Sequence, residues 1–485
     1  MSSEQRSATL AEGVVGFPTA LATSIGLIIA ASVVLTATQG FGVGGGTFAL
    51  AIVIAYVVMM AQSSSFAEAS ALMPTAGSVY DYIAAGMGRF FAITGTLAAY
   101  LIVHLFAGTA ETASAGLFAA ASFEPLEGLL EGGSWMVAVI LLAVFGVVNY
   151  LGIEVYGRAE VGMTAFMWLT LFVFGLLGTI QAKTAPIEGF FGSGLIGPSP
   201  GFETVLSMVG LAMFLFVGVE YVTPLASELR DPFRNIPRAM YVGVTMVAVA
   251  MFLYGAGVTR QVENVLLDEE AGVFLFDTPF AIPEFASAVM GDFGVWWLGI
   301  AVLLASAATI NTLMAGIPRI LYGMAKDGTM PAIFGRVHAK YKSPYMGIGV
   351  AFIIPAVYAI VIDGDIDSIF VLILAAVCAW LFSYILVNIS VISLRVRRPD
   401  LDRPFRDRLY PVSQLVAIAA LLVTLWYIAP PFLTRGEIYI RFFVMLGLSA
   451  IYALVWLLIV KRQEAWKPVE PAILIAEERE VNPTG

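Results

Sequence analysis

The most informative stretch is Phe216-Val217-Gly218-Val219-Glu220-Tyr221-Val222-Thr223-Pro224, because it places a glycine, a carboxylate and a proline inside a long apolar segment. An ionisable group within a membrane segment is costly and by default indicates a function. Interrupted backbone is tolerated at that depth only where it lines a cavity or is buried in protein. Small residues also serve helix packing in membranes, but Gly218 beside Glu220 and ahead of Pro224 favours a broken helix over 204–227.

The first apolar segment carries a similar interruption, Ser24-Ile25-Gly26 followed by Ala30-Ala31-Ser32. For this segment alone, close packing and a break explain the small residues equally well. Two interrupted helices, five apart in order, are the sequence pattern of a transporter site built on an inverted repeat. A broken helix exposes N–H groups that suit a carboxylate and carbonyl groups that suit an ammonium or a cation. A zwitterionic amino acid offers both groups.

The rest of the chain is built for a lipid environment. Of its 485 residues 59% are hydrophobic and only 12% are charged, and the mean hydropathy is +0.89. The apolar residues come in blocks of about 20, the length that crosses a bilayer as a helix. We therefore predict an all-α polytopic membrane protein. Its twelve expected helices cover 14–37, 48–69, 89–121, 134–151, 161–182, 204–227, 238–259, 293–320, 345–362, 368–394, 410–431 and 438–460.

Charge predicts the orientation. An even number of helices puts both termini on one side of the membrane, and most of the 25 Lys and Arg residues fall on that side. By the positive-inside rule, both termini are expected in the cytoplasm of a protein of the cell membrane. The polar segment 1–13 lacks the basic start and cleavage site of a signal peptide, so the first apolar segment is expected to remain as a helix. The arginines of 230–238 and 395–408 are interpreted as topology determinants that also contact membrane lipids.

Several classes of protein are disfavoured. The lone Cys378 allows no disulfide within the chain, and with two histidines a metal site is not expected. No cluster of catalytic groups appears, so the chain is not predicted to be an enzyme. No cofactor and no nucleic-acid partner are indicated.

Two stretches between the predicted helices are expected to lie at the surface. The stretch 183–203 is predicted to be a loop, and Arg260 to Asp292 to form short surface helices joined by turns.

Four motifs carry a family resemblance. The most specific is Phe216-Val-Gly-Val-Glu220 with Glu228-Leu-Arg-Asp-Pro-Phe-Arg-Asn-Ile-Pro-Arg-Ala239. The others are Pro318-Arg-Ile-Leu-Tyr-Gly-Met-Ala-Lys-Asp-Gly-Thr-Met-Pro331, Phe66-Ala-Glu68 with Pro74-Thr-Ala-Gly-Ser-Val-Tyr80, and Arg398-Pro-Asp400 with Arg403-Pro-Phe405. Together they resemble the amino acid–polyamine–organocation transporter superfamily, and within it the amino acid permeases.

The resemblance implies ten core helices in two inverted five-helix repeats, with broken helices one and six, and two peripheral helices. The first repeat then covers 14–182, the second 204–394 and the peripheral helices 410–460, with cytoplasmic segments at 1–13 and 461–485. The family usually has Gly-Ser-Gly where this chain has Ala30-Ala31-Ser32. The resemblance implies that substrate is bound at Ile28, Ala30, Ala31, Ser32, Phe214, Val217 and Gly218. His104 is added to this set because it is an ionisable residue inside a membrane segment.

Four further positions are candidates for ion coupling or for support of a helix break. Glu111 lies seven residues after His104 and shares its helix face; it could carry a proton, bind an amine or be paired in the outer vestibule. His104 could contact substrate or carry a proton, or be a neutral histidine bonded to a neighbouring helix. Glu220 is expected to hold the break open rather than to contact substrate. Ser306 and Thr309 could offer oxygens to sodium, although hydroxyls more often bond to their own helix.

The sequence thus predicts a secondary transporter for amino acids or related small amines, working by alternating access. Its partners would be the small-molecule substrate, a coupling proton or sodium, and membrane lipids. A polyamine transporter or an amino acid exchanger remains open, and a position of Glu111 outside the cavity would weaken the polyamine alternative. A channel or a non-transporting sensor is disfavoured, because a channel favours a ring of repeated polar residues.

Overall fold

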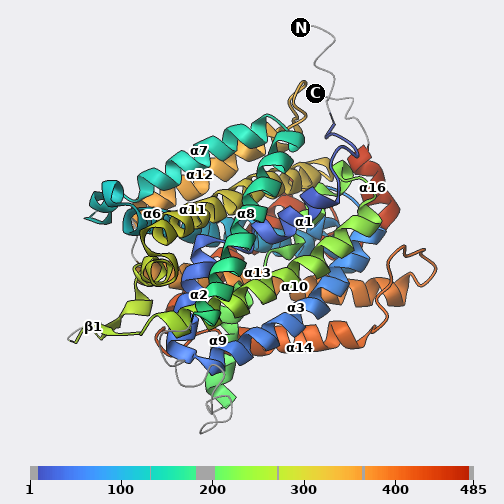
Figure 1. Cartoon of the computed structure of the whole chain (residues 1–485). Helices are drawn as coiled ribbons and strands as arrows, with labels where there is room; N and C mark the ends of the chain where they lie inside the picture. The colour runs from blue at the N-terminus through green and yellow to red at the C-terminus, as the bar shows by residue number, and fades with distance from the viewer. Residues whose placement is uncertain (1–8, 132, 182–201, 270–271, 363–365, 480–485) are drawn as a thin grey trace.

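A computed structural model describes residues 9–131, 133–181, 202–269, 272–362 and 366–479, and these form a bundle made almost entirely of helices (Figure 1). Nine helices in this part of the chain are long and apolar enough to span a membrane. They are Gly46–Leu72 (α3), Arg89–Ser122 (α5, η2, η3 and α6), Ile153–Ile180 (α8), Phe202–Glu228 (α9 and η6), Pro232–Gln261 (α10), Ala281–Lys326 (α11), Tyr345–Ile362 (α12), Ser368–Arg397 (within α13, Ile366–Arg397) and Arg435–Lys461 (α15 and η9).

Four further apolar helices belong to the bundle. The pair α1 (Phe17–Gly26) and α2 (Ala31–Gly44) is long enough to span only when taken together, and it bends by 51° at its break. The apolar helices α7 (Trp135–Tyr150) and α14 (Val412–Trp426) are shorter. Each of the twelve predicted helices overlaps one of these elements, so the predicted polytopic all-α class is confirmed.

Both predicted breaks are present. In the first helix, residues 27–30 leave the helical path between α1 and α2; in the sixth, residues 215–218 separate α9 (Phe202–Phe214) from the 3-10 helix η6 (Val219–Glu228). Gly218 has φ 103°, a left-handed conformation that only glycine adopts at low cost. A Cβ on Gly218 would overlap the Leu27 side chain, so the two breaks lie directly against each other.

The third helix is irregular. After α5 (Arg89–Thr96) it widens into two π-helical segments, η2 (Leu97–Ile102) and η3 (His104–Gly108), before α6 (Thr109–Ser122) resumes the α-helical path. Such π-bulges occur frequently at functional sites, because the extra residue in each turn redirects the side chains that follow. Here they precede Glu111, which lies in the first turn of α6.

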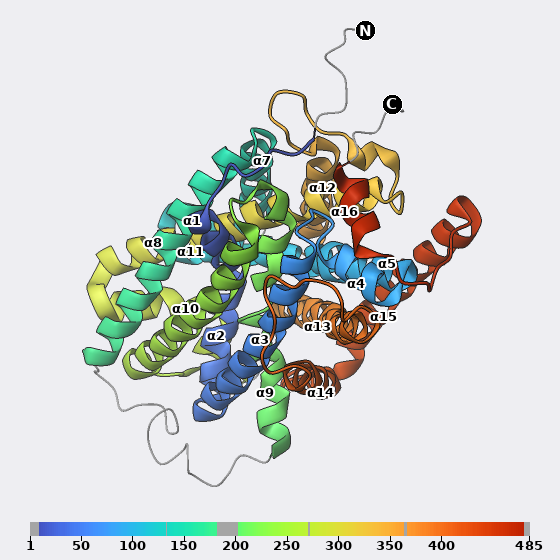
Figure 2. The ribbon, with the colours of Figure 1, turned by 90° about the vertical axis from the view of Figure 1, so that its right-hand side faces the viewer.

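The four sequence motifs pair with one another at one end of the bundle. We call this end the α16 face, after the helix α16 (Pro471–Arg479) that lies on it at the right of Figure 1 and faces the viewer in Figure 2. Arg319 of the second motif forms a buried ion pair with Glu228 of the first. Residues before α1 add to this closure, because Val15 bridges to Leu229 in parallel register.

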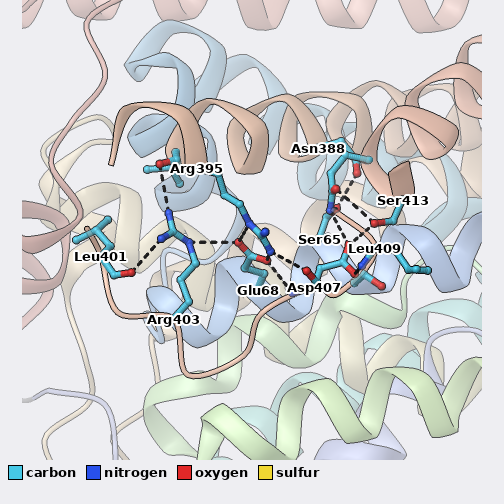
Figure 3. A network of polar contacts seen from close by, with 12 residues as sticks. Ser65, Glu68, Asn388, Arg395, Leu401, Arg403, Asp407, Leu409 and Ser413 are labelled. Atoms are coloured by element: carbon cyan, nitrogen blue, oxygen red, sulfur yellow. Dashed lines mark hydrogen bonds and ion pairs between the residues drawn. The ribbon is translucent and has the colours of Figure 1, made fainter. Parts of the chain in front are cut away.

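The third and fourth motifs also meet on the α16 face (Figure 3). Arg395 binds both carboxylate oxygens of Glu68, and Arg403 Nε lies 3.3 Å from Glu68 Oε1. The Asp407 N–H donates to the same carboxylate at 3.0 Å. Arg395 and Arg403, which we interpreted as topology determinants, therefore also pin the loop after α13 to α3.

Several sequence expectations need correction. Helix α8 begins at Ile153 rather than 161, because Glu154, Arg158 and Glu160 lower the hydropathy of its first turns. Helices α10 and α11 are likewise longer than predicted at their starts, and α11 kinks at Gly291. The stretch from Arg260 to Asp292 was expected to form short surface helices joined by turns. It does contain the 3-10 helix η7 (Leu275–Asp277) and the part of α11 before Gly291, but also the antiparallel pair β1 (Leu266–Asp268) and β2 (Val273–Phe274), which was not expected. The short helices α4 (Val79–Met87) and α16 were missed. Most of the predicted loop 183–203 lies outside the described residues.

Candidate functional site

A small enclosed cavity lies where the two breaks meet. It has a volume of about 20 Å³ for the centre of a water-sized sphere, enough for roughly one water. An amino acid is larger than that, so the helices are closed around the cavity in this structure. Its walls come from five helices: Leu27, Ala30, Ser32, Val33, Ala107, Glu111, Phe214, Val217, Thr309, Leu313 and Trp380.

The lining is mainly apolar. Among these residues the polar groups are the hydroxyls of Ser32 and Thr309, the indole N–H of Trp380 and the carboxyl group of Glu111, and none is basic. Of the predicted substrate-binding residues, Ala30, Ser32, Phe214 and Val217 line the cavity. Thr309 and Glu111, predicted for coupling or support, line it as well.

Glu111 caps the N-terminus of α2. Its Oε1 accepts the Ala31 N–H at 2.9 Å, and its Oε2 accepts the Ser32 N–H at 3.0 Å and the Ser32 hydroxyl at 2.5 Å. These N–H groups have no partner within the helix, and the helix dipole adds partial positive charge there. The carboxylate is 1% exposed, so the interaction takes place away from bulk water. The N–H groups that we expected to receive a substrate carboxylate are thus occupied by a side chain of the protein.

A second set of contacts holds the break in the sixth helix. The Tyr384 hydroxyl of α13 accepts the Gly218 N–H at 3.0 Å and donates to Glu220 Oε2 at 2.5 Å. The Trp380 indole N–H donates to Glu220 Oε1 at 3.1 Å. Glu220 is fully buried and does not line the cavity. Glu220 thus contacts the break through Tyr384, a residue that the sequence analysis missed.

The end of α1 is held by α11. Thr309 Oγ1 donates to the carbonyl oxygen of Gly26 at 3.0 Å and is 3.5 Å from that of Leu27. These carbonyls are freed by the break. Thr309 therefore bonds across to another helix, whereas the hydroxyl of Ser306 is buried without a partner among the described residues.

The remaining predicted residues lie outside the cavity lining. His104 Nε2 is 2.6 Å from the carbonyl oxygen of Ala351 in α12, which corresponds to the alternative of a histidine bonded to a neighbouring helix. Ile28 is buried in the first break. Ala31 contributes its N–H to Glu111, and Gly218 contributes its N–H to Tyr384.

Two kinds of residue escaped the sequence analysis. Leu27, Val33, Ala107 and Leu313 are apolar residues whose facing no motif reveals. Trp380 and Tyr384 lie four residues apart in α13, a spacing that puts both on one helix face. Two polar aromatic residues at this spacing in a predicted membrane helix were the sequence feature that could have identified them as site residues.

Broken helices that meet at an enclosed cavity inside a polytopic bundle are the arrangement in which secondary transporters build their substrate sites. A family model described as amino acid permease matches residues 15–459, and the chain therefore belongs to this family, as the resemblance of its motifs implied. It is an integral membrane protein of a family of amino acid transporters.

Characterised relatives cover most of the chain. A branched-chain amino acid permease of Bacillus subtilis is 24% identical over 81% of this chain and 83% of its own length. A glutamate/serine transporter of the same organism is 25% identical over 88% of this chain and 79% of its own. The human large neutral amino acids transporter small subunit 2 is 24% identical over 84% and 77%. These names cover several substrate classes, so the substrate has to be argued from the cavity.

Proposed function

We propose that this protein moves a neutral amino acid with an apolar side chain across the cell membrane by alternating access. The carrying observation is the cavity at the two breaks, whose lining is apolar apart from two hydroxyls, an indole N–H and Glu111. An acidic side chain would need a basic partner, because an unpaired charge is costly to bury, and none lines the cavity. Two of the relatives are named for branched-chain and large neutral amino acids, which supports the same choice.

The binding mode follows from the backbone groups that the two breaks leave without partners inside their own helices. The carbonyls at the ends of α1 and α9 suit the ammonium group, and the N–H groups of Ala31 and Ser32 suit the carboxylate. Glu111 must leave those N–H groups for the carboxylate to bind. Displacement of Glu111 is therefore part of the proposed binding step.

The transport cycle rests on the expected repeat. We assign 14–182 to the first five-helix repeat and 204–394 to the second, with 410–460 peripheral and the segments 1–13 and 461–485 in the cytoplasm. One bundle then rocks against the other around the cavity. The closed contacts on the α16 face, Glu228–Arg319 among them, have to open for release to the cytoplasm.

Small amines are the second candidate. A position of Glu111 outside the cavity would have weakened this alternative. Glu111 instead lines the cavity, so a small amine stays a candidate. An amine without a carboxylate would leave Glu111 on the α2 N-terminus and could bind beside it.

Thermal unfolding of the purified protein with a panel of ligands tests the choice. A ligand that binds only the folded state at about 100 times its Kd stabilises it by about 2.7 kcal/mol. We expect L-leucine or L-valine to raise the melting temperature and putrescine to leave it unchanged, at two pH values and with or without sodium. A shift with putrescine alone would establish the amine candidate, and no shift with any of these ligands would overturn the proposed substrate.

A further inference from the structure

Glu160 is a buried acid in the spans that neither the motifs nor the cavity include, and it differs from the buried Glu68 and Glu228, which are paired with arginines. It lies in α8 with no exposed surface. Its Oε2 accepts the Asn311 amide at 2.7 Å, and its Oε1 accepts the hydroxyls of Thr312 at 3.0 Å and Thr164 at 3.3 Å. All three partners are neutral, and no Lys, Arg or His in the described part of the chain forms an ion pair with it.

The position of Glu160 relative to helix ends sets it apart from Glu111 and Glu220. Glu111 caps the N-terminus of α2, and Glu220 is the second residue of η6, so each carboxylate lies at the positive end of a helix. Glu160 instead abuts Gly26, the last residue of α1, where a Cβ would overlap its Oε1. The partial negative charge of the α1 carbonyls therefore repels its charge, and the site favours the uptake of one positive charge.

The geometry favours a proton over a metal cation. Sodium needs several converging oxygens, whereas the neighbours of Glu160 turn N–H and O–H donors toward it. The amide oxygen of Asn311 is already bonded to Asn149 Nδ2 of α7 at 2.8 Å. Gly26 also takes up space beside Oε1, since a Cβ on Gly26 would lie 1.8 Å from that oxygen.

Other titratable groups near Glu160 are engaged elsewhere. On α8, the Tyr156 hydroxyl bonds to Thr23 of α1 at 2.7 Å. On α11, Arg319 is paired with Glu228. On α10, which packs against both α1 and α8, Arg238 lies over the Phe17 ring at the start of α1.

We propose that Glu160 binds and releases the proton that couples transport to a pH gradient, an inference that rests on the proposed transport function. The carboxylate takes one proton from the side where the gradient supplies it, and returns the proton to water on the other side once per cycle.

Protonation changes what Glu160 can hold. One carboxyl oxygen becomes a donor, so Thr312 or Asn311 loses an acceptor while the acid can donate to a carbonyl at the end of α1. Residues 309–312 of α11 contact both Glu160 and that end, through Thr312 and through Thr309 with Gly26. The proton thereby alters the contact of α1 with α8 and α11, and α1 leads directly into the cavity residues Leu27 and Ala30.

The test separates coupling from transport in proteoliposomes. The probe is whichever of L-alanine, L-serine, L-valine and L-leucine gives the largest counterflow with the wild-type protein. In Glu160→Gln we expect counterflow of that amino acid to continue, since exchange needs no net proton movement, while accumulation driven by a pH gradient falls to the equilibrium level. With one proton per solute, a gradient of one pH unit gives the wild type roughly tenfold accumulation. Glu160→Asp keeps a carboxyl group and should accumulate the probe.

The control is Glu154→Gln, the same substitution at an exposed position of α8, which should accumulate like the wild type. Accumulation by Glu160→Gln under a pH gradient would overturn the proposal. So would wild-type accumulation that depends on a sodium gradient and ignores pH, a result that does not require Glu160→Gln to fold. Absence of counterflow with all four amino acids would instead refute the proposed function itself.

Discussion

Glu111 and Ser32 are joined through one carboxylate oxygen, which accepts both the backbone N–H of Ser32 at 3.0 Å and its hydroxyl at 2.5 Å. A side chain of the third helix thus binds the helix N-terminus at which a bound amino acid would place its own carboxylate. Two anions cannot occupy this terminus together. A substrate carboxylate can therefore bind these N–H groups only when Glu111 releases them.

Replacing Glu111 by Gln should strengthen the binding of a neutral amino acid. A hydrogen bond to a charged group contributes about 1.5–3 kcal/mol, and one between neutral groups about 0.5–1.5 kcal/mol. The glutamine therefore competes less well for the N–H groups, and we expect the Kd to fall about tenfold, equivalent to about 1.4 kcal/mol. Isothermal titration with L-leucine measures this change.

The exposed Glu203 of α9 supplies the control as Glu203→Gln, for which the Kd should not change. A higher Kd in Glu111→Gln would mean that the Glu111 carboxylate attracts the ammonium group of the substrate rather than competing with the substrate carboxylate. That outcome would favour the amine candidate.

Gly218→Ala should destabilise the protein and slow transport. The left-handed φ of 103° costs a non-glycine residue about 1–3 kcal/mol, and the added Cβ would overlap the Leu27 side chain. The matched control is Gly349→Ala within α12, where a Cβ meets no atom within 4 Å. Alanine should be neutral or slightly stabilising there. Equal melting temperatures for the two variants would show that the break can relax around the added methyl group.

Sequence reasoning recovered the fold and the breaks because both depend on local composition. Apolar blocks fix the spans, and Gly218 beside Glu220 and Pro224 fixes the second break. The partners across the site could not be predicted in the same way. That Tyr384 bridges Gly218 and Glu220, or that Glu111 reaches Ser32, depends on how helices far apart in sequence pack. Glu160 was missed for a different reason, since its charge made the first turns of α8 look like a loop.

The buried pair of Glu228 and Arg319 should show strong coupling in a double-mutant cycle. The two side chains are 1% and 2% exposed, and loss of one partner leaves an uncompensated buried charge that costs about 3–5 kcal/mol. We expect Glu228→Gln and Arg319→Met each to lower the melting temperature markedly, and the double variant to be more stable than the sum of the two losses implies.

The exposed pair Glu437 and Arg441 is the control for this cycle. Its side chains are 60% and 35% exposed, and the closest atoms are 3.9 Å apart. A surface pair of this kind is worth at most about 1 kcal/mol. Additive losses at Glu228 and Arg319 would contradict the buried ion pair as a closing contact of the α16 face.

Asp81→Asn should flatten the pH dependence of stability. Asp81 lies in α4, outside the spans, where it is 4% exposed and accepts the Thr75 hydroxyl. Burial, and secondarily the charge of Glu478, raise the pKa of Asp81 well above its usual range. Because the pKa is higher in the folded than in the unfolded state, the folded state binds more protons, and stability falls as pH rises above about 3.9.

Asparagine cannot ionise, so the stability of the variant relative to the wild type should increase as pH rises from mildly acidic to mildly basic. Melting temperatures across that range measure the gain, with the exposed Asp402→Asn as control. Parallel curves for the wild type and Asp81→Asn would show that the carboxyl has the same pKa in both states, which burial against α16 should prevent.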